Sequence, residues 1–209
     1  MKPKAPLELI IKEAVDVLNR GGIIGYPTET VYGLGGDGTK PQVVRRIQKL
    51  KGRHFDKPLL ILTAGIDEAV SLVSNVLPVA KDLMDSFWPG PLTLLFQGRG
   101  SLPVGVLGPD HRIGIRVSSD PVCMALLKRF NKPLISTSAN PEGEKPATGA
   151  SEVEGYFECL IDFIVDGGIR KSSKPSTVLD VSVEPPVLIR SGVISKQSIQ
   201  TVVGRIDER

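Results

Sequence analysis

The sequence predicts an α/β protein in which a twisted, mixed β-sheet is covered by helices. Apolar residues recur at helical spacing in several early segments of the chain. Short β-branched or leucine-rich segments, bounded by Gly, Pro, Asn or Asp, follow one another closely in the later part. Because helices and strands do not alternate strictly, this spacing favours a mixed sheet over a purely parallel one.

The early part of the chain combines helices with strands. Apolar periodicity predicts a helix over residues 7–18, which the glycine pair 21–22 would end, and a first strand over residues 23–26. A second helix, capped by Thr39, is predicted to stop at Gly52. Next come a strand over residues 59–62 and helices over residues 67–73 and 78–87.

The later part of the chain is predicted to consist mainly of strands. They cover residues 92–96, 112–117, 133–137, 163–165, 176–181 and 187–190. With 209 residues, of which 41% are hydrophobic, the chain can bury one core. We therefore expect a single domain over residues 1–209, with its core at about residues 7–195.

Composition excludes several classes of protein. The net charge of +3 suits an anionic ligand but is smaller than that of a dedicated nucleic-acid binder. Cys123 and Cys159 are far apart in sequence, so they indicate neither a disulfide framework nor a zinc site. The first residues do not resemble a signal peptide, and no later apolar run reaches membrane-spanning length. We expect a soluble, cytoplasmic protein without a membrane partner.

The stretch GGIIGYPTETVYGLGG, residues 21–36, is the most informative part of the sequence. A short apolar strand runs into hydroxyl and carboxyl side chains and then into a glycine-dense turn. Ligands of α/β proteins bind at such strand ends, where small residues let the backbone approach them.

Familiar catalytic motifs do not occur. The sequence has no GxxxxGK[ST] loop, no GxSxG elbow and no HExxH, and His54 and His111 are not spaced as a ligand pair. The segment GLGGDG, residues 33–38, lacks the third glycine of a dinucleotide loop in register. Acyl transfer through a Ser/His/Asp triad is therefore not expected.

Cations and hydroxyl groups at the ends of predicted elements remain as candidate site residues. Lys51 and Arg53 flank a glycine that stops a helix, while Arg116 and Arg190 each end a strand. A single cation of this kind is usually a solvated surface charge. Arginines at strand ends can, however, grip carboxylate or phosphate in bidentate fashion. The small polar residues Ser136–Asn140, and Ser176 with Thr177, follow or begin apolar strands in the same way.

Six segments carry a resemblance to a known family. They are PTETVYGLG, KGR, IGIR, STSAN, PSTVLD and LIRSG, in this order. In them, over about residues 7–195, the chain resembles the YrdC/Sua5 family of L-threonylcarbamoyladenylate synthases. The resemblance implies a YrdC-like fold with a large basic concave cavity, in the short form without the C-terminal Sua5 extension.

The resemblance also implies an ATP-dependent nucleotidyltransferase. Its substrates would be L-threonine, bicarbonate and ATP, and its products threonylcarbamoyl-AMP and diphosphate. A threonylcarbamoyl-transferase complex would then use the threonylcarbamoyl-AMP to modify adenosine 37 of tRNA. Mg²⁺ would accompany ATP, held mainly by phosphates and water, and no protein metal site is predicted.

Site residues follow from the same resemblance, position by position. Threonine and bicarbonate would contact Thr28, Thr30, Arg116 and Ser136. ATP would contact Lys51, Arg53, Ser138, Asn140, Ser176 and Arg190. Lys51 and Arg53 would also be catalytic, by neutralising charge during adenylate formation.

Other functions stay open at this stage. A basic surface could bind tRNA or double-stranded RNA without turnover, through Lys40, Arg45, Arg46, Lys49, Lys51 and Arg53 around the second helix. The ordinary solvated face of an amphipathic helix explains the same charges. A related carbamoyl-adenylate enzyme, like the YrdC-like domain of hydrogenase maturation proteins, would bring acylphosphatase and CxxC segments, which this sequence lacks. A paralogue with an altered substrate is the third alternative.

Overall fold

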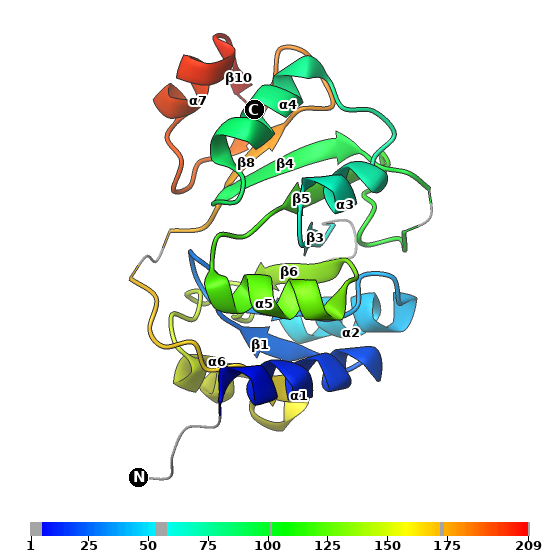
Figure 1. Ribbon diagram of the computed structural model, residues 1–209, viewed down its shortest axis with the longest axis vertical. Coiled ribbons are helices and arrows are strands. Elements are labelled where there is room, and N and C mark those ends of the chain that lie inside the picture. The colour runs from blue at the N-terminus through cyan, green and yellow to red at the C-terminus, as the bar shows by residue number, and fades with distance from the viewer. Residues whose placement is uncertain (1–5, 53–57, 101, 172–173, 209) are drawn as a thin grey trace.

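Strands of one mixed sheet run through the molecule, and helices lie against them (Figure 1). The computed structural model describes residues 6–52, 58–100, 102–171 and 174–208. The α-helices within these ranges are α1 (Leu7–Asn19), α2 (Pro41–Lys51), α3 (Ile66–Ser71), α4 (Pro78–Phe87), α5 (Pro121–Phe130), α6 (Ala150–Phe157) and α7 (Lys196–Val203). The strands are β1 (Ile24–Tyr26), β2 (Gly33–Gly35), β3 (Leu60–Leu62), β4 (Leu92–Gln97), β5 (Arg112–Arg116), β6 (Leu134–Ser138), β7 (Phe163–Ile164), β8 (Thr177–Asp180), β9 (Val187–Arg190) and β10 (Asp207–Glu208).

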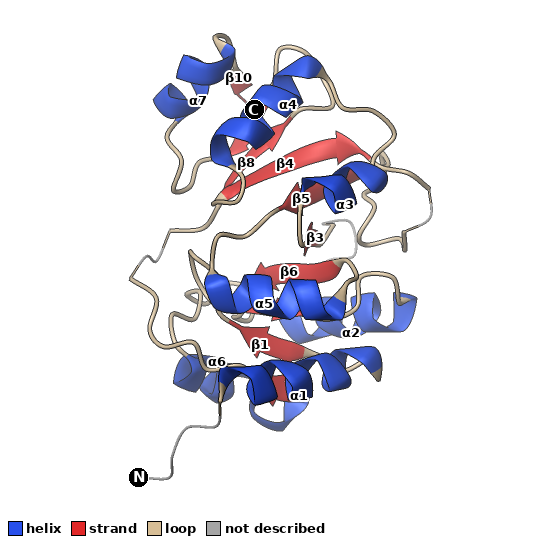
Figure 2. Ribbon diagram, in the orientation of Figure 1, coloured by secondary structure: helices blue, strands red, loops and turns tan. Residues whose placement is uncertain are grey.

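The sheet is mixed, as the sequence predicts. Its strand order is β10-β9-β8-β4-β5-β3-β6-β2-β1-β7. The pairs β1/β7, β3/β5, β4/β8 and β9/β10 are parallel, whereas the other neighbours are antiparallel. Figure 2 shows strands at all levels of the molecule, with helices α1 and α5 side by side across one face of the sheet.

Alternation along β1 explains how helices cover both faces of this part of the sheet. Ile24 and Tyr26 belong to a cluster that α1 and α5 cover. Ile23 instead packs into the main core with residues of α2, and the Gly25 backbone faces Val153 of α6. Since successive side chains of a strand point to opposite faces, a three-residue strand anchors two layers of helix.

Around residues 33–40, two predictions differ from the structure. The expected glycine-dense turn is strand β2, fully buried between β1 and β6. Glycine serves close packing here: a Cβ atom at Gly35 would lie 2.2 Å from the carbonyl oxygen of Ile135. The cap residue of α2 is Lys40, because the Thr39 hydroxyl donates instead to Asp37 Oδ1 at 2.5 Å.

Helices α5, α6 and α7 lie where the pattern predicts only strands and connections. Helix α5 has the clearest ends. The Asp120 carboxylate accepts hydrogen bonds from the backbone N–H groups of Val122 and Cys123, and Pro121 starts the first turn. Asn131 ends the helix in the left-handed conformation. These are recognisable start and stop signals in the sequence.

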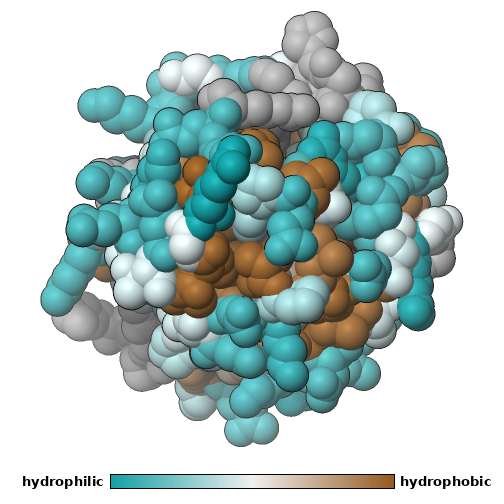
Figure 3. All heavy atoms as spheres, turned by 90° about the horizontal axis from the view of Figure 1, so that it is seen from above, coloured by the Kyte–Doolittle hydropathy of each residue, from teal (hydrophilic) through white to brown (hydrophobic). Residues whose placement is uncertain are grey.

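The surface is mixed in character. Seen from the end that carries α4 and α7, hydrophilic side chains surround a band of apolar ones (Figure 3). Apolar atoms contribute much of the surface of ordinary globular proteins, so a band of this kind does not by itself define a site. None of the helices described is both long enough and apolar enough to span a membrane.

We predict that Gly35→Ala destabilises the fold. The added methyl group would lie 2.2 Å from the Ile135 oxygen and 2.7 Å from Tyr26 Cε1, so strands β1, β2 and β6 would have to separate. The expected loss in free energy of unfolding is about 2 to 3 kcal/mol, measured by urea denaturation.

Gly155→Ala is the matched control. Gly155 lies in α6, and a Cβ atom there would meet nothing within 4 Å. Alanine at this helical position should stabilise the protein by up to about 1 kcal/mol. Equal effects of the two substitutions would contradict the close packing of β2.

Candidate functional site

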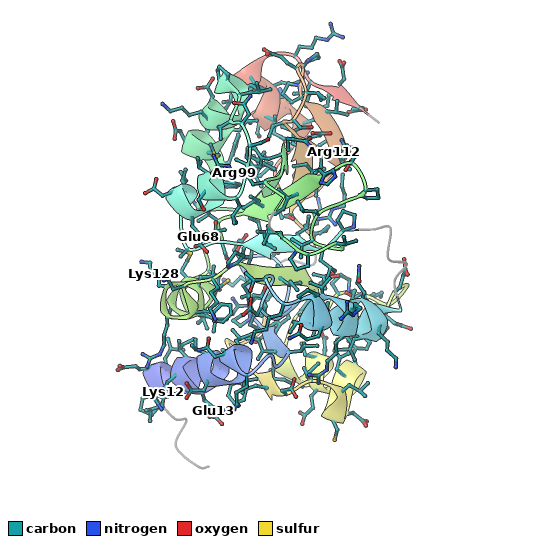
Figure 4. The ribbon with its side chains drawn as sticks, turned by 90° about the vertical axis from the view of Figure 1, so that its right-hand side faces the viewer. Lys12, Glu13, Glu68, Arg99, Arg112 and Lys128 are labelled. Carbon is teal, nitrogen blue, oxygen red and sulfur yellow. The ribbon has the colours of Figure 1, made fainter. Side chains whose placement is uncertain are left out.

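A cavity of about 820 Å³ opens against one face of the sheet. Alternate residues of several strands line it: Leu60 and Leu62, Thr93 and Leu95, Arg112, Gly114 and Arg116, Ser136 and Ser138, Ser176 and Val178. Ile61, Leu94, Ile113, Ile115 and Ile135, which lie between them in sequence, belong to the core on the other face. Figure 4 shows Arg112 on the opposite side of the ribbon from Glu68 and Lys128, which belong to α3 and α5.

Nine of the ten predicted site residues line this cavity. They are Thr28, Thr30, Lys51, Arg116, Ser136, Ser138, Asn140, Ser176 and Arg190. The tenth, Arg53, falls outside the described residues. Lys51, Arg112, Arg116 and Arg190 contribute positive charge to the wall, and Asp110 and Glu142 contribute negative charge. The cavity is therefore basic, as the resemblance implies.

Lys51 is part of the cavity wall and not a solvated surface charge. Only 5% of the residue is exposed. Its ammonium group donates to the carbonyl oxygens of Ser138 at 2.6 Å and of Asn140 at 2.5 Å, and also lies 3.1 Å from Asn140 Oδ1. These contacts join the end of α2 to the end of β6. A full positive charge is thereby fixed at a site of low dielectric, where it acts more strongly on an anion than it would in water.

Asn140 organises the loop that follows β6. Its amide nitrogen donates to the carbonyl oxygens of Pro141 and Glu144, each at 2.8 Å. Its side-chain oxygen accepts from Lys51. Both amide hydrogens are therefore used inside the protein, and only lone-pair capacity on Oδ1 remains for a ligand.

Arg116 ends β5 beside a carboxylate. Its Nη1 atom lies 2.7 Å from Glu29 Oε1, and the Ser118 hydroxyl donates to the other oxygen of Glu29. The side chains of Arg116 and Glu29 are 7% and 13% exposed. Glu29 thus compensates a nearly buried guanidinium and fixes its orientation at the cavity.

The two threonines of the PTET segment have different hydrogen-bonding capacity. Thr28 Oγ1 donates to the carbonyl oxygen of Val31 at 2.6 Å and accepts from the backbone N–H of Thr30 at 3.2 Å. The two threonine hydroxyls lie 3.0 Å apart. Since Thr28 has only one hydroxyl hydrogen, Thr30 must be the donor between them. Thr28 is saturated by its own turn, whereas Thr30 Oγ1 keeps both lone pairs.

Ser176 and Arg190 meet at the ends of β8 and β9. Arg190 Nη2 donates to the Ser176 carbonyl oxygen at 2.9 Å and to its hydroxyl oxygen at 3.2 Å. The same hydroxyl lies 2.9 Å from Thr93 Oγ1. The hydrogen bonds that Arg190 donates to Ser176, directly before β8, therefore set the direction of the Arg190 side chain.

Sequence reasoning missed Glu29 and Arg112. Arg112 lines the cavity from the start of β5, between the carboxylates of Asp110 and Asp180, to both of which it donates. The Arg112 guanidinium holds the pKa of the Asp110 carboxyl below its ordinary value. The sequence did contain a signal for Arg112. Residues 112 and 116 of the RIGIR strand lie on the same face, so a cavity that contains Arg116 should also contain Arg112.

Tyr26 and Cys123 lie behind the site and do not line it. The Tyr26 hydroxyl donates to the carbonyl oxygen of Ile135 at 3.1 Å, and burial raises the pKa of Tyr26. Burial likewise raises the pKa of the Cys123 thiol to about 12. Both groups therefore remain protonated near neutral pH.

In the described part of the chain, no group of three or more His, Cys, Asp or Glu side chains could hold a metal ion.

Residues 16–192 match a family model named for Sua5, YciO and YrdC and described as "Telomere recombination". The chain belongs to the Sua5/YciO/YrdC family. Its resemblance to this family, based on six short segments, is thereby confirmed over most of the sequence. The mixed sheet and the cavity described above are thus features of a Sua5/YciO/YrdC protein.

Two relatives illustrate the extent of the match. The threonylcarbamoyl-AMP synthase of Pyrococcus abyssi is 34% identical over 196 residues, which cover 94% of this chain and 58% of the relative. The synthase of Hahella chejuensis is 37% identical over 172 residues, which cover 82% of this chain and 94% of the relative. The chain therefore spans little more than half the length of the first relative and almost all of the second.

The match extends to three-dimensional structure. The crystal structure of P. abyssi Sua5 complexed with L-threonine superimposes with a TM-score of 0.93 at 33% identity. The superposition covers 97% of this chain and 59% of that protein. The predicted fold class is confirmed.

We predict that Glu29→Ala lowers the free energy of unfolding by about 3 kcal/mol, because it leaves the Arg116 guanidinium nearly buried and without its carboxylate. Denaturant titration measures the change. Glu208→Ala is the control, since Glu208 pairs with Lys196 at a similar distance of 2.8 Å but both side chains are at least 40% exposed. That substitution should cost less than about 1 kcal/mol. Similar losses for both variants would contradict a special role for the Glu29 pair.

Proposed function

We propose that the protein is an L-threonylcarbamoyladenylate synthase, which forms threonylcarbamoyl-AMP and diphosphate from L-threonine, bicarbonate and ATP. One observation supports this reaction most directly. Four cationic side chains and a row of hydroxyl groups converge on a single cavity large enough for a nucleotide and an amino acid.

The reaction suits such a cavity because it needs no protein nucleophile. The amine nitrogen of threonine adds to the carbon of bicarbonate, and loss of water leaves a carbamate. A carbamate oxygen then attacks the α-phosphorus of ATP, and the bond from that phosphorus to diphosphate breaks. The protein's task is to position the reactants and to neutralise charge in the transition state.

We assign the two ends of the cavity to different substrates. Arg116 would bind the carboxylate of threonine, with Ser136 nearby, and Thr30 would accept a hydrogen bond from the substrate. Thr28 would shape the turn without contacting the substrate, since its hydroxyl is saturated.

The nucleotide would occupy the rest of the cavity. Lys51, Ser138, Asn140, Ser176 and Arg190 would surround ATP, and Lys51 together with Arg53 would neutralise charge as diphosphate leaves. Mg²⁺ would enter as part of the substrate MgATP. The wall offers it few carboxylates, since Asp110 is paired with Arg112, and coordination by phosphates and water suits this ion.

The product would pass to a threonylcarbamoyl-transferase complex that modifies adenosine 37 of tRNA, which implies a cytoplasmic place of action. Weak tRNA binding by this chain would be compatible with that role. As a separate function it has less support, because the cationic run on α2 is divided. Arg46 is paired with Asp162 at 2.7 Å, Lys40 donates to the Asn19 carbonyl oxygen, and Lys51 belongs to the cavity.

Diphosphate release from MgATP should require both L-threonine and bicarbonate. We predict turnover with threonine and little with valine, since a site that accepts a hydrogen bond from the substrate hydroxyl discriminates against a substrate that lacks it. The measurement is a coupled diphosphate assay with each amino acid in turn. Turnover independent of threonine and bicarbonate would overturn the proposal, and preference for another amino acid would indicate a paralogue with an altered substrate.

Lys51→Ala should lower kcat by on the order of 10²-fold or more, because a fixed charge beside the leaving diphosphate is lost. Lys49→Ala, an exposed position on the same helix, is the control and should leave kcat unchanged. Steady-state kinetics with both variants gives the comparison. If both reduced salt-sensitive RNA binding while turnover was absent from the wild type, the RNA-binding alternative would replace the synthase.

A further inference from the structure

A chain of polar contacts lies behind the cavity wall, next to the turn that carries Thr30. It begins at Arg116, which donates to Glu29. The Ser118 hydroxyl donates to the second oxygen of Glu29 and accepts from the backbone N–H of Asp120 at 3.2 Å. Ser118 is fully buried, so it joins the Glu29 carboxylate to the Asp120 backbone out of contact with solvent.

Arg170 closes this chain into a ring. Its Nη1 atom lies 2.6 Å from Asp120 Oδ2 and 3.4 Å from the carbonyl oxygen of Thr28. Thr28 and Glu29 are consecutive residues, so the contacts return to their starting point. The turn is thus fixed at two neighbouring positions, by Arg116 through the Glu29 side chain and by Arg170 through the Thr28 backbone.

The segment that carries Arg170 is itself firmly attached to the turn. The Tyr32 hydroxyl donates to the carbonyl oxygen of Gly168 at 2.9 Å and accepts from the backbone N–H of Gly167 at 3.0 Å. A Cβ atom at Gly167 would lie 2.5 Å from Pro27. The connection between β7 and β8 is therefore packed closely against residues 27–32. These contacts hold the backbone near Arg170 in place, so that its side chain can reach the turn.

Charge makes Arg170 more than a packing residue. Asp120 is 5% exposed, and its other oxygen caps α5. The Arg170 guanidinium compensates this buried carboxylate while it also donates to Gly167 and Thr28. Its Nε atom is buried without a hydrogen-bond partner. The side chain therefore leaves one N–H unsatisfied in the position that allows the other contacts.

We propose that Arg170, which does not line the cavity, is a positioning residue for its amino-acid end. By joining Asp120 to the Thr28 carbonyl, it fixes the position of Thr30 relative to Arg116, so that both residues can contact the same substrate molecule. This inference rests on the proposed synthase function. The nucleotide end, around Lys51 and Ser176, lies on other elements than the ring.

The experiment compares Arg170→Met and Arg170→Lys with Arg46→Met and the wild type. Arg46 is a matched control, because it too joins distant segments through an aspartate, Asp162, and a carbonyl oxygen, that of Leu160. The Michaelis constants for threonine and for ATP are measured separately, together with threonine binding by calorimetry and the melting temperature.

Arg170→Met should raise the threonine Michaelis constant by on the order of tenfold or more while the ATP constant stays within about twofold, since misplacing a binding group impairs only the substrate that it contacts. Arg170→Lys keeps the positive charge but loses the planar guanidinium that donates to several acceptors at once. It should raise the threonine Michaelis constant by a smaller factor. Arg46→Met should change neither constant. A merely structural role would lower the melting temperature without this split.

Two outcomes would overturn the inference: equal changes in both constants, or none in either. If Arg170→Met failed to fold, Arg170→Lys would decide by the same criterion. A wild-type protein without threonine-dependent diphosphate release would contradict the proposed function itself. Calorimetry would then still report whether Arg170 affects threonine binding.

Discussion

Positive charge buried in the cavity wall is the constraint on which this structure depends. A cation with little access to water is tolerated only where oxygen atoms surround it. Lys51 meets carbonyl groups at the end of β6, and Arg116 meets Glu29. Each of these partners comes from a distant part of the sequence, so satisfying the charges also determines which segments must be neighbours.

Strand pairing brings those segments together. The central strands β4, β5, β3 and β6 present alternate residues to the cavity and to the core, so one face carries the polar chemistry while the other carries the apolar packing. The site is therefore formed on backbone that the core makes rigid. Rigid support would suit the proposed reaction, which relies on positioning and charge neutralisation, because side chains that are already in place need little rearrangement when substrates bind.

Much of this arrangement could be predicted from the sequence, and the reasons for the failures are physical. Apolar strands ending in Arg116 and Arg190 indicate candidate anion contacts, because strand periodicity is local information, and the family resemblance implies that they meet at one basic cavity. The partners of those cations were not predictable in the same way. In the sequence, Glu29 is an ordinary polar residue after a strand. Only the arrangement of β1 and β5 in one sheet shows that its carboxylate meets Arg116. The sequence predicts a turn at Gly33 and Gly35, since it does not reveal that the Tyr26 ring and the Ile135 carbonyl occupy the space of a side chain. Helix α5, in contrast, carried readable signals in Asp120, Pro121 and Asn131.

The position of β8 and β9 in the strand order has a consequence for biosynthesis. Ser176 lies directly before β8 and Arg190 ends β9, yet these strands pair with β4 and with each other, far across the sheet from β1 and β2. While the chain is being made, the turn that carries Thr30 and the strand that ends in Arg116 emerge long before the last wall of the cavity exists. A nascent chain therefore lacks the complete cavity, and a ligand that contacts Arg190 can stabilise the protein only after residues 187–190 have joined the sheet.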